Sequence, residues 1–149
     1  DGFQANVFHL KCDGRGETIT VVKTTTECIF GGYASLSWVS AGKWIKDNSA
    51  FLFCLKNPNG TSMKCPVRNL GHALYGHGSQ GPTFGSNNDL YISGNCNQDG
   101  GSYVNVGAAY NNNGQHCFEF NGGASNFTVQ EIEVFCVDPN ATNNNTKHS

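Results

Sequence analysis

Short runs of β-branched and aromatic residues, separated by turn signals, follow one another along most of this chain. The clearest are residues 17–25 (ETITVVKTT), 50–57 (AFLFCLKN) and 127–137 (FTVQEIEVFCV). Such runs favour strands, because branched and aromatic side chains pack well on a pleated surface. Only 13% of the residues are charged and 19 are glycine, which is unlike a chain with long surface helices. The sequence therefore predicts a mainly β protein.

The turn signal NPNG at residues 57–60 stands between two of the expected strands, 50–57 and 62–67, and predicts a hairpin. Residues 50–57 are a continuous apolar run, which predicts a strand covered on both faces. Three more strands are expected at 27–35, 89–94 and 116–122.

Two stretches suit helical pieces better than strands. Residues 2–12 carry apolar residues at helical spacing and are expected to contain a helix, and residues 40–47 are expected to form a short helix or a turn. The whole pattern predicts a two-sheet antiparallel β sandwich with short flanking helices.

Length and charge limit the classes of protein that this chain can belong to. Its 149 residues suit one domain, expected at residues 1–138, and the polar residues 139–149 are expected to form a flexible tail. Nine Lys and Arg residues show no cluster, so we predict no nucleic-acid partner. No apolar run approaches the roughly 20 residues of a membrane span, so we predict no membrane insertion.

Cysteine usage predicts the compartment. The chain has seven cysteines and no C-x-x-C pair, which makes zinc-ribbon and thioredoxin interpretations poor. It also contains four N-glycosylation sequons, at Asn59, Asn126, Asn140 and Asn144. Together these features predict a secreted, disulfide-bonded glycoprotein, with a reduced cytosolic protein as the alternative.

Disulfide pairing cannot be deduced from spacing alone, because seven cysteines allow many connectivities. Cys54 and Cys65 flank the NPNG turn and would face each other across the expected hairpin. Cys28 is the expected leftover, either buried and inert or bridging two chains of a homodimer. The predicted pairs are Cys54–Cys65, Cys96–Cys117 and Cys12–Cys136.

Five blocks in order resemble one known family. They are GFQANVFHLKCDGRGETITVVKT, IFGGYASLSW, DNSAFLFCLKN, GPTFGSNNDLYIS and EIEVFCV, and they cover residues 2–137. This series resembles the TLDc domain, the module of the oxidation-resistance proteins. The resemblance implies a β-sandwich core with short flanking helices. Intracellular members of that family are linked to oxidative-stress protection and to binding of the vacuolar proton pump, whereas this chain adds cysteines and sequons.

Two motifs with the letters of catalytic or cofactor sites have simpler interpretations. Residues 76–81 read G-x-G-x-x-G, but neither a βαβ unit nor a helical pattern follows, so the glycines are expected to serve backbone geometry. Glu131 and Glu133 point to one face of a strand, which suits a solvated face better than an acid–base pair. His72 and His77 are expected to be loop or surface histidines. We predict that the chain is not an enzyme.

Asn-rich loops are the candidate site for a ligand. Calcium prefers oxygen ligands, so Asp89, Asn97 and Asp99 are candidate calcium ligands, although these residues are also ordinary turn formers. Sugars are bound by amide and carboxylate groups beside an aromatic ring, and Trp38 and Trp44 are alternative stacking residues. The predicted ligand-binding residues are Asn87, Asn88, Asp89, Tyr91, Asp99, Tyr110 and Asn112.

These observations favour a secreted ligand-recognition module, a carbohydrate-binding lectin or innate-defence protein whose partner is a glycan or another extracellular ligand. An extracellular structural or matrix protein and an oxidation-protective TLDc protein are the alternatives.

Overall fold

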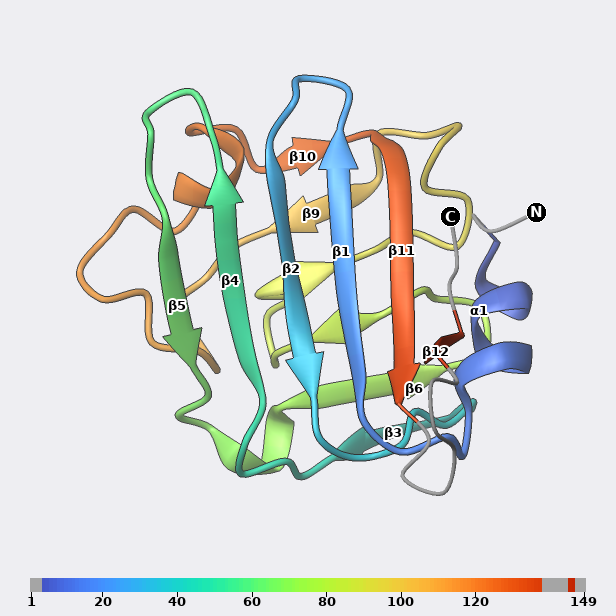
Figure 1. Cartoon of the computed structure of the whole chain (residues 1–149). Coiled ribbons are helices and arrows are strands. Elements are labelled where there is room, and N and C mark those ends of the chain that lie inside the picture. Colours follow the sequence, from blue (N-terminus) through green and yellow to red (C-terminus); the bar gives the residue numbers. More distant parts are fainter. Residues whose placement is uncertain (1–3, 138–144, 147–149) are drawn as a thin grey trace.

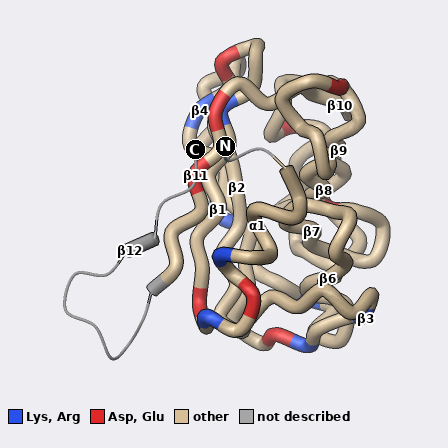
Figure 2. The backbone as a smooth tube through the Cα atoms, turned by 90° about the vertical axis from the view of Figure 1, so that its right-hand side faces the viewer, with Lys and Arg blue, Asp and Glu red and all other residues tan. Residues whose placement is uncertain are grey.

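Two packed β-sheets make up the computed structural model, which describes residues 4–137 and 145–146. Figure 1 views the first sheet face-on, with the strands of the second sheet crossing behind it. Figure 2 shows the two layers from the side, with acidic and basic residues interspersed rather than gathered into a patch of one sign. The predicted antiparallel β sandwich is confirmed.

Within the described residues each sheet has six strands, and every adjacent pair with a residue register runs antiparallel. The first sheet has the order β12 (Asn145–Thr146), β11 (Val129–Val137), β1 (Thr18–Thr24), β2 (Ile29–Ala34), β4 (Phe51–Lys56), β5 (Met63–Pro66). The second has the order β10 (Asn126–Phe127), β9 (Ser102–Val104), β8 (Leu90–Tyr91), β7 (Thr83–Phe84), β6 (Leu74–His77), β3 (Ala41–Ile45).

The hairpin expected around NPNG is confirmed as β4 and β5. Asn57 shapes its turn, because the side-chain oxygen of Asn57 accepts the backbone N–H groups of Asn59 and Thr61 at 3.0 and 2.9 Å. The expectation that β4 is covered on both faces is wrong. Leu52 and Cys54 are buried between the sheets, whereas Phe51 and Phe53 lie partly exposed on the outer face of the first sheet.

The helix expected within residues 2–12 is confirmed as α1 (Ala5–Cys12), which lies beside β11 (Figure 1). His9 is buried. Its Nδ1 lies 2.7 Å from a carboxylate oxygen of Asp13, and its Nε2 lies 2.8 Å from the carbonyl oxygen of Gln80. This histidine therefore connects α1 to the loop before β7.

Two local expectations are wrong. Residues 40–47 contain the edge strand β3, because Gly42 adopts a φ of +73° and makes a bulge that lets the chain continue along β6. Residues 116–122 were expected as a strand but contain a 3₁₀ helix, η2 (Glu119–Asn121). Gly122, with a φ of +68°, ends η2 and turns the chain away. A second 3₁₀ helix, η1 (Leu70–His72), precedes β6.

The core between the sheets is centred on large aromatic rings. Trp38 has no exposed surface, its ring centroid lies 5.4 Å from those of Phe8 and Phe84, and its Nε1 donates to the Thr18 hydroxyl at 2.9 Å. This bond satisfies the indole N–H that burial would otherwise leave unpaired. Trp38 is therefore a core residue and not a sugar-stacking residue.

The glycine motif at 76–81 serves backbone geometry, as expected. Gly76 lies in β6, where a Cβ would lie 2.5 Å from the Val39 carbonyl oxygen. A Cβ at Gly81 would lie 2.8 Å from the Ile92 carbonyl oxygen. The element that follows the motif is β7 and not a helix, so the motif lacks the helix N-terminus that would bind a phosphate.

One of the three expected cysteine pairs is in contact. The sulfur atoms of Cys12 at the end of α1 and Cys136 in β11 lie 3.1 Å apart, as two hydrogen-bonded thiols. The hydrogen bond with Cys12 lowers the pKa of Cys136, and the positive charge of Arg15 lowers it further. The same hydrogen bond, with burial, raises the pKa of Cys12.

The other cysteines are less favourably placed for bridges. Cys65 lies opposite Leu52, and Cys54 opposite Met63, so the two thiols are diagonal across the hairpin and not directly facing. Burial raises the pKa of Cys54 to about 11 and that of Cys65 to about 12, as expected of unreactive thiols. Cys28 has no exposed surface, which favours its buried state over a bridge between chains.

The pair Cys96–Cys117 stays a prediction. Cys96 is buried and Cys117 is partly exposed, and their carbonyl oxygens accept from different segments, Val129 and Val106. Burial raises the pKa of Cys96 to about 12. No helix within the described ranges is long and apolar enough to cross a membrane.

We predict that a mild disulfide oxidant such as oxidised glutathione converts Cys12 and Cys136 into a disulfide, because their sulfurs are already in contact. The two thiols lose their hydrogens and electrons to the oxidant, which becomes two thiols. The closed loop should raise the free energy of unfolding by about 2–4 kcal/mol. Alkylation and peptide mapping before and after oxidation detect the bridge. Cys12→Ser should abolish it and Cys28→Ser should not; retention of two alkylatable thiols would contradict the prediction.

Candidate functional site

Asp89 is the most highly connected residue of the loops expected to bind a ligand. It has no exposed surface, and its Oδ2 accepts the backbone N–H groups of residues 107–110 at 3.0–3.1 Å. Its backbone oxygen also accepts from Asn105 at 3.0 Å. Burial raises the pKa of the Asp89 carboxyl, although the four backbone hydrogen bonds act in the opposite direction. Asp89 therefore holds the loop after β9 and does not face a ligand.

The position of the Asp89 carboxylate requires a glycine at residue 85. Its φ is +94°, and a Cβ there would lie 2.2 Å from Oδ1 of Asp89. A side chain at Gly85 would thus be strained and would also occupy the space of the carboxylate. The GPTFG block and the aspartate four residues later form one structural unit.

Tyr110 is also a core residue, contrary to its prediction as a ligand contact. It has no exposed surface, and its hydroxyl donates to the Ala73 carbonyl oxygen at 2.6 Å. Burial raises its pKa. Asn112 shapes a turn, because its Nδ2 donates to the Val106 carbonyl and its Oδ1 accepts the N–H of Gly114. The polar groups of Asn112 therefore hydrogen-bond within the loop.

The remaining predicted ligand-binding residues are exposed or half-buried. Asn87 and Asn88 are exposed at the turn before β8, and Asn88 adopts a φ of +55°, which asparagine tolerates in turns. Tyr91 is half-buried in β8. Asp99 accepts the Ser93 hydroxyl at 2.9 Å and the Gly101 N–H at 3.0 Å.

The expected calcium ligands are not brought together. Asp89 is enclosed by the loop that it organises, whereas Asn97 and Asp99 are exposed in the loop after β8. Within the described ranges, no group of three or more His, Cys, Asp and Glu residues is placed to hold a metal ion. A calcium site that uses Asp89 would break its backbone hydrogen bonds, so the structure argues against this residue as a ligand.

Two sequons lie in the described part of the chain. Asn59 is exposed next to the β4–β5 turn, where its Nδ2 donates to Glu119 at 3.3 Å. Asn126 is exposed in β10, and its Nδ2 donates to the carbonyl oxygens of Gly100 and Ser102 at 3.2 and 3.4 Å. Asn140 and Asn144 lie outside the described residues.

Glu131 and Glu133 line a shallow hollow of about 150 Å³ on the outer face of the first sheet. Lys23 lies opposite Glu131 in the register of β1 and β11, and Val21 and Ile29 complete the hollow. A lysine opposite one of the two carboxylates on an open sheet face fits the solvated-face interpretation of this pair.

A better candidate site lies on the outer face of the second sheet, at its β3 edge. Four rings meet there, and we call them the aromatic surface: Trp44, His72, Tyr75 and His77. The Trp44 ring centroid lies 4.7 Å from that of His72 and 4.8 Å from that of Tyr75, and Tyr75 stacks on His77 at 6.1 Å. Trp44 is 39% exposed, which is unusual for so large a ring.

Strand pairing produces this row of rings. Trp44 lies opposite Tyr75 in the register of β3 and β6, and His77 follows Tyr75 by two residues on the same face. The bulge at Gly42 keeps the face open, because a Cβ there would stand 3.4 Å from the His77 ring and 3.9 Å from the Tyr75 hydroxyl. Ile45 and Leu74 point to the opposite side, and Leu74 is buried in the core.

The sequence offered a partial signal for this surface. The sequence predicts Trp44 as an alternative stacking residue, but a helix or turn at residues 40–47 does not pair it with Tyr75. The surface follows once residues 41–45 are assigned as an edge strand, because Trp44 then lies on the face opposite to that of Ile45. His72 and His77 are only partly exposed, and both contribute to it.

The sequence model of the TLDc domain matches residues 1–138. A search of curated proteins finds no match to the chain.

We predict that Asp89→Asn lowers the free energy of unfolding by about 2–4 kcal/mol, since an amide presents an NH₂ group to backbone donors that need an acceptor. Urea unfolding followed by fluorescence measures this loss. Glu131→Gln makes the same change from carboxylate to amide on the exposed face of β11 and, as the control, should change stability by less than about 0.5 kcal/mol. Equal stability of the two variants would show that Asp89 does not hold the loop.

Proposed function

The chain belongs to the TLDc domain family, and we propose that this member is a secreted recognition module, a lectin or innate-defence protein that binds carbohydrate on the aromatic surface. The observation that carries the proposal is the exposure of Trp44 within a row of rings on a sheet face. A pyranose ring has an apolar C–H face that packs on an indole, and hydroxyl groups at its edges that hydrogen-bond to polar neighbours.

The neighbours of Trp44 have the polar atoms that such a ligand needs. His72 and Tyr75 lie beside the indole, and His77 stacks on the far side of Tyr75. Ser79 donates both its N–H and its hydroxyl toward Nδ1 of His77. These two contacts fix the orientation of the His77 ring and make Nδ1 the acceptor, so Nε2 carries the proton. The surface thus combines a stacking platform with donors at its rim.

Secretion is part of the proposal and is supported by the cysteines and sequons of the chain. Membership of the TLDc family is also compatible with the oxidation-protective alternative. The two functions predict different behaviour, because protection from oxidants requires reactive groups, whereas sugar binding requires only the exposed rings.

We predict that the protein binds glycans and that Trp44→Ala weakens this binding at least about tenfold, because a central aromatic contact is lost. A glycan array identifies the ligand, and calorimetry measures its affinity. Tyr91→Ala is the matched control, since Tyr91 is a half-buried tyrosine of the same sheet. A blank array at high protein concentration, or loss of binding in Tyr91→Ala alone, would contradict the proposal.

A second candidate function is assembly with another protein surface, which the outer face of the first sheet favours. Tyr33 stacks on Phe51 at 5.1 Å, and Lys64 stands 4.3 Å above the Phe51 ring. Leu55 and Ile19 on the same face are 57% and 37% exposed. This cluster of partly exposed apolar side chains on β1, β2 and β4 is typical of an interaction surface, and a second copy of this chain would cover it symmetrically.

We predict that the protein forms a dimer through this face and that Leu55→Glu dissociates it, because a carboxylate would be desolvated in an apolar contact. Sedimentation equilibrium measures the association constant. Leu10→Glu is the control, since Leu10 is exposed on α1 and away from the sheet. A monomeric native protein at high concentration would rule out this assembly.

A further inference from the structure

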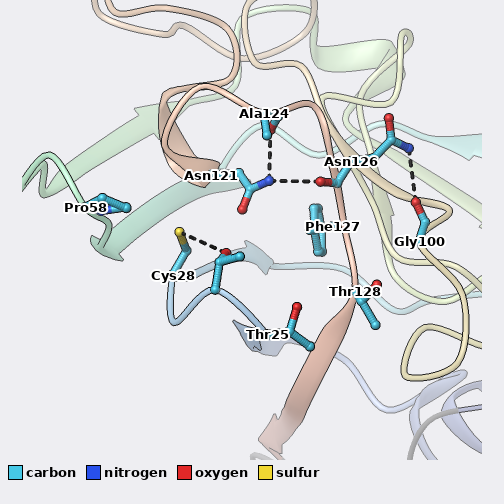
Figure 3. Close-up of a pocket in the computed structure, with 10 residues that line it drawn as sticks. Thr25, Cys28, Pro58, Gly100, Asn121, Ala124, Asn126, Phe127 and Thr128 are labelled. Carbon is cyan, nitrogen blue, oxygen red and sulfur yellow. Dashed lines mark hydrogen bonds between the residues drawn. The ribbon is translucent and has the colours of Figure 1, made fainter.

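A cavity of about 430 Å³ opens at the end of the sandwich where β1 turns into β2. Its walls come from the turn at residues 25–28, from Pro58 in the β4–β5 turn and from the segment 121–128 that leads into β11 (Figure 3). Figure 1 places this end opposite to β3, which carries the aromatic surface. The cavity is therefore separate from the site of the proposed carbohydrate binding, and its size suits a small ligand.

Asn121 gives the cavity an unsatisfied acceptor. Its side chain is fixed, because Nδ2 donates to the carbonyl oxygens of Ala124 at 2.9 Å and Asn126 at 3.1 Å. These two acceptors determine which end of the amide is the nitrogen. Asn121 is 7% exposed, and within the described part of the chain its Oδ1 has no hydrogen-bond partner.

The direction of that oxygen is clear in Figure 3. It points away from the carbonyls of Ala124 and Asn126, toward the space between Cys28 and Phe127. An acceptor buried in protein without a donor is destabilising, so a ligand that supplies an N–H or O–H to this oxygen gains affinity. The cavity thus contains a preformed point of recognition.

The remaining walls indicate an uncharged ligand with an apolar part. None of the ten residues that line the cavity is Lys, Arg, Asp or Glu. Phe127 and Pro58 supply apolar rings, and Thr25 and Thr128 supply hydroxyl groups. An anion or cation would lose its hydration here without gaining a partner of opposite charge.

We propose that this cavity binds the acetamido group of a small neutral ligand such as an N-acetylated sugar. The ligand N–H donates to Oδ1 of Asn121, its carbonyl oxygen accepts from a threonine hydroxyl at the rim, and its methyl group packs on Phe127 and Pro58. Each part of a secondary amide thus meets a matching group of the wall. This site is independent of the aromatic surface and uses none of its residues.

Titration of ¹⁵N-labelled protein with N-acetylglucosamine tests the proposal by NMR. We expect shifts of the Asn121 side-chain amide and of the Thr25 and Thr128 backbone amides, saturating in the millimolar range. Glucose is the matched control ligand, since it lacks the acetamido group, and it should leave these signals in place. Absence of shifts with N-acetylglucosamine, or equal shifts with glucose, would overturn the proposal.

Two variants separate a lost site from a lost fold. Asn121→Leu removes the acceptor and should weaken binding about tenfold or more. Gly100→Leu places a side chain at the rim, where a Cβ lies 3.7 Å from the Thr128 hydroxyl at ordinary contact distance, and should block the cavity without backbone strain. Gly71→Leu is the control, because its Cβ meets open space at η1. Unchanged binding in folded Gly100→Leu protein would exclude the cavity.

The aromatic surface is tested in the same titrations. Trp44→Ala should leave the shifts around Asn121 unchanged even where it abolishes glycan binding on the array. If Trp44→Ala removes the Asn121 shifts as well, the acetamido group binds at the aromatic surface and the proposal for the cavity is wrong.

Discussion

The buried carboxylate of Asp89 is the interaction on which the second sheet depends. It gathers four consecutive backbone N–H groups at residues 107–110 and thereby fixes a loop that has no regular ladder of its own. The same loop then delivers the Tyr110 hydroxyl to the Ala73 carbonyl just before β6. One side chain thus sets the relation between β8, the loop after β9 and the start of β6, and through β6 it supports the strand that carries Tyr75 and His77.

Polar side chains order several loops of this protein. The chain has few charged groups, and its asparagines act mainly as substitutes for backbone partners: Asn57, Asn111 and Asn112 each accept N–H groups two residues further on. Such loops are ordered by local hydrogen bonds and not by salt bridges.

Local patterns in the sequence predicted those parts of the fold whose causes are local. The NPNG turn identified the β4–β5 hairpin, and helical spacing identified α1. Residues 40–47 were misassigned because Gly42 bulges an edge strand whose pairing with β6 depends on residues thirty positions away. Residues 116–122 were misassigned because Gly122 ends η2 beside Pro58, a contact between distant segments. The loop site failed for a related reason: asparagine and aspartate look the same in sequence whether they face a ligand or their own backbone, and only burial separates Asp89 from Asn87.

Asn126 belongs both to a predicted N-glycosylation sequon and to the wall of the cavity. Its side-chain nitrogen, which donates to Gly100 and Ser102, is also the atom that a sequon presents for N-linkage, and Asn126 lines the cavity beside Asn121. N-linkage leaves this nitrogen a single hydrogen, so one of the two contacts must be given up. In a secretory pathway, partial occupancy at this position would therefore divide the protein into two glycoforms. One would have an open cavity, and the other would carry its own sugar chain at the entrance, in competition with any free ligand.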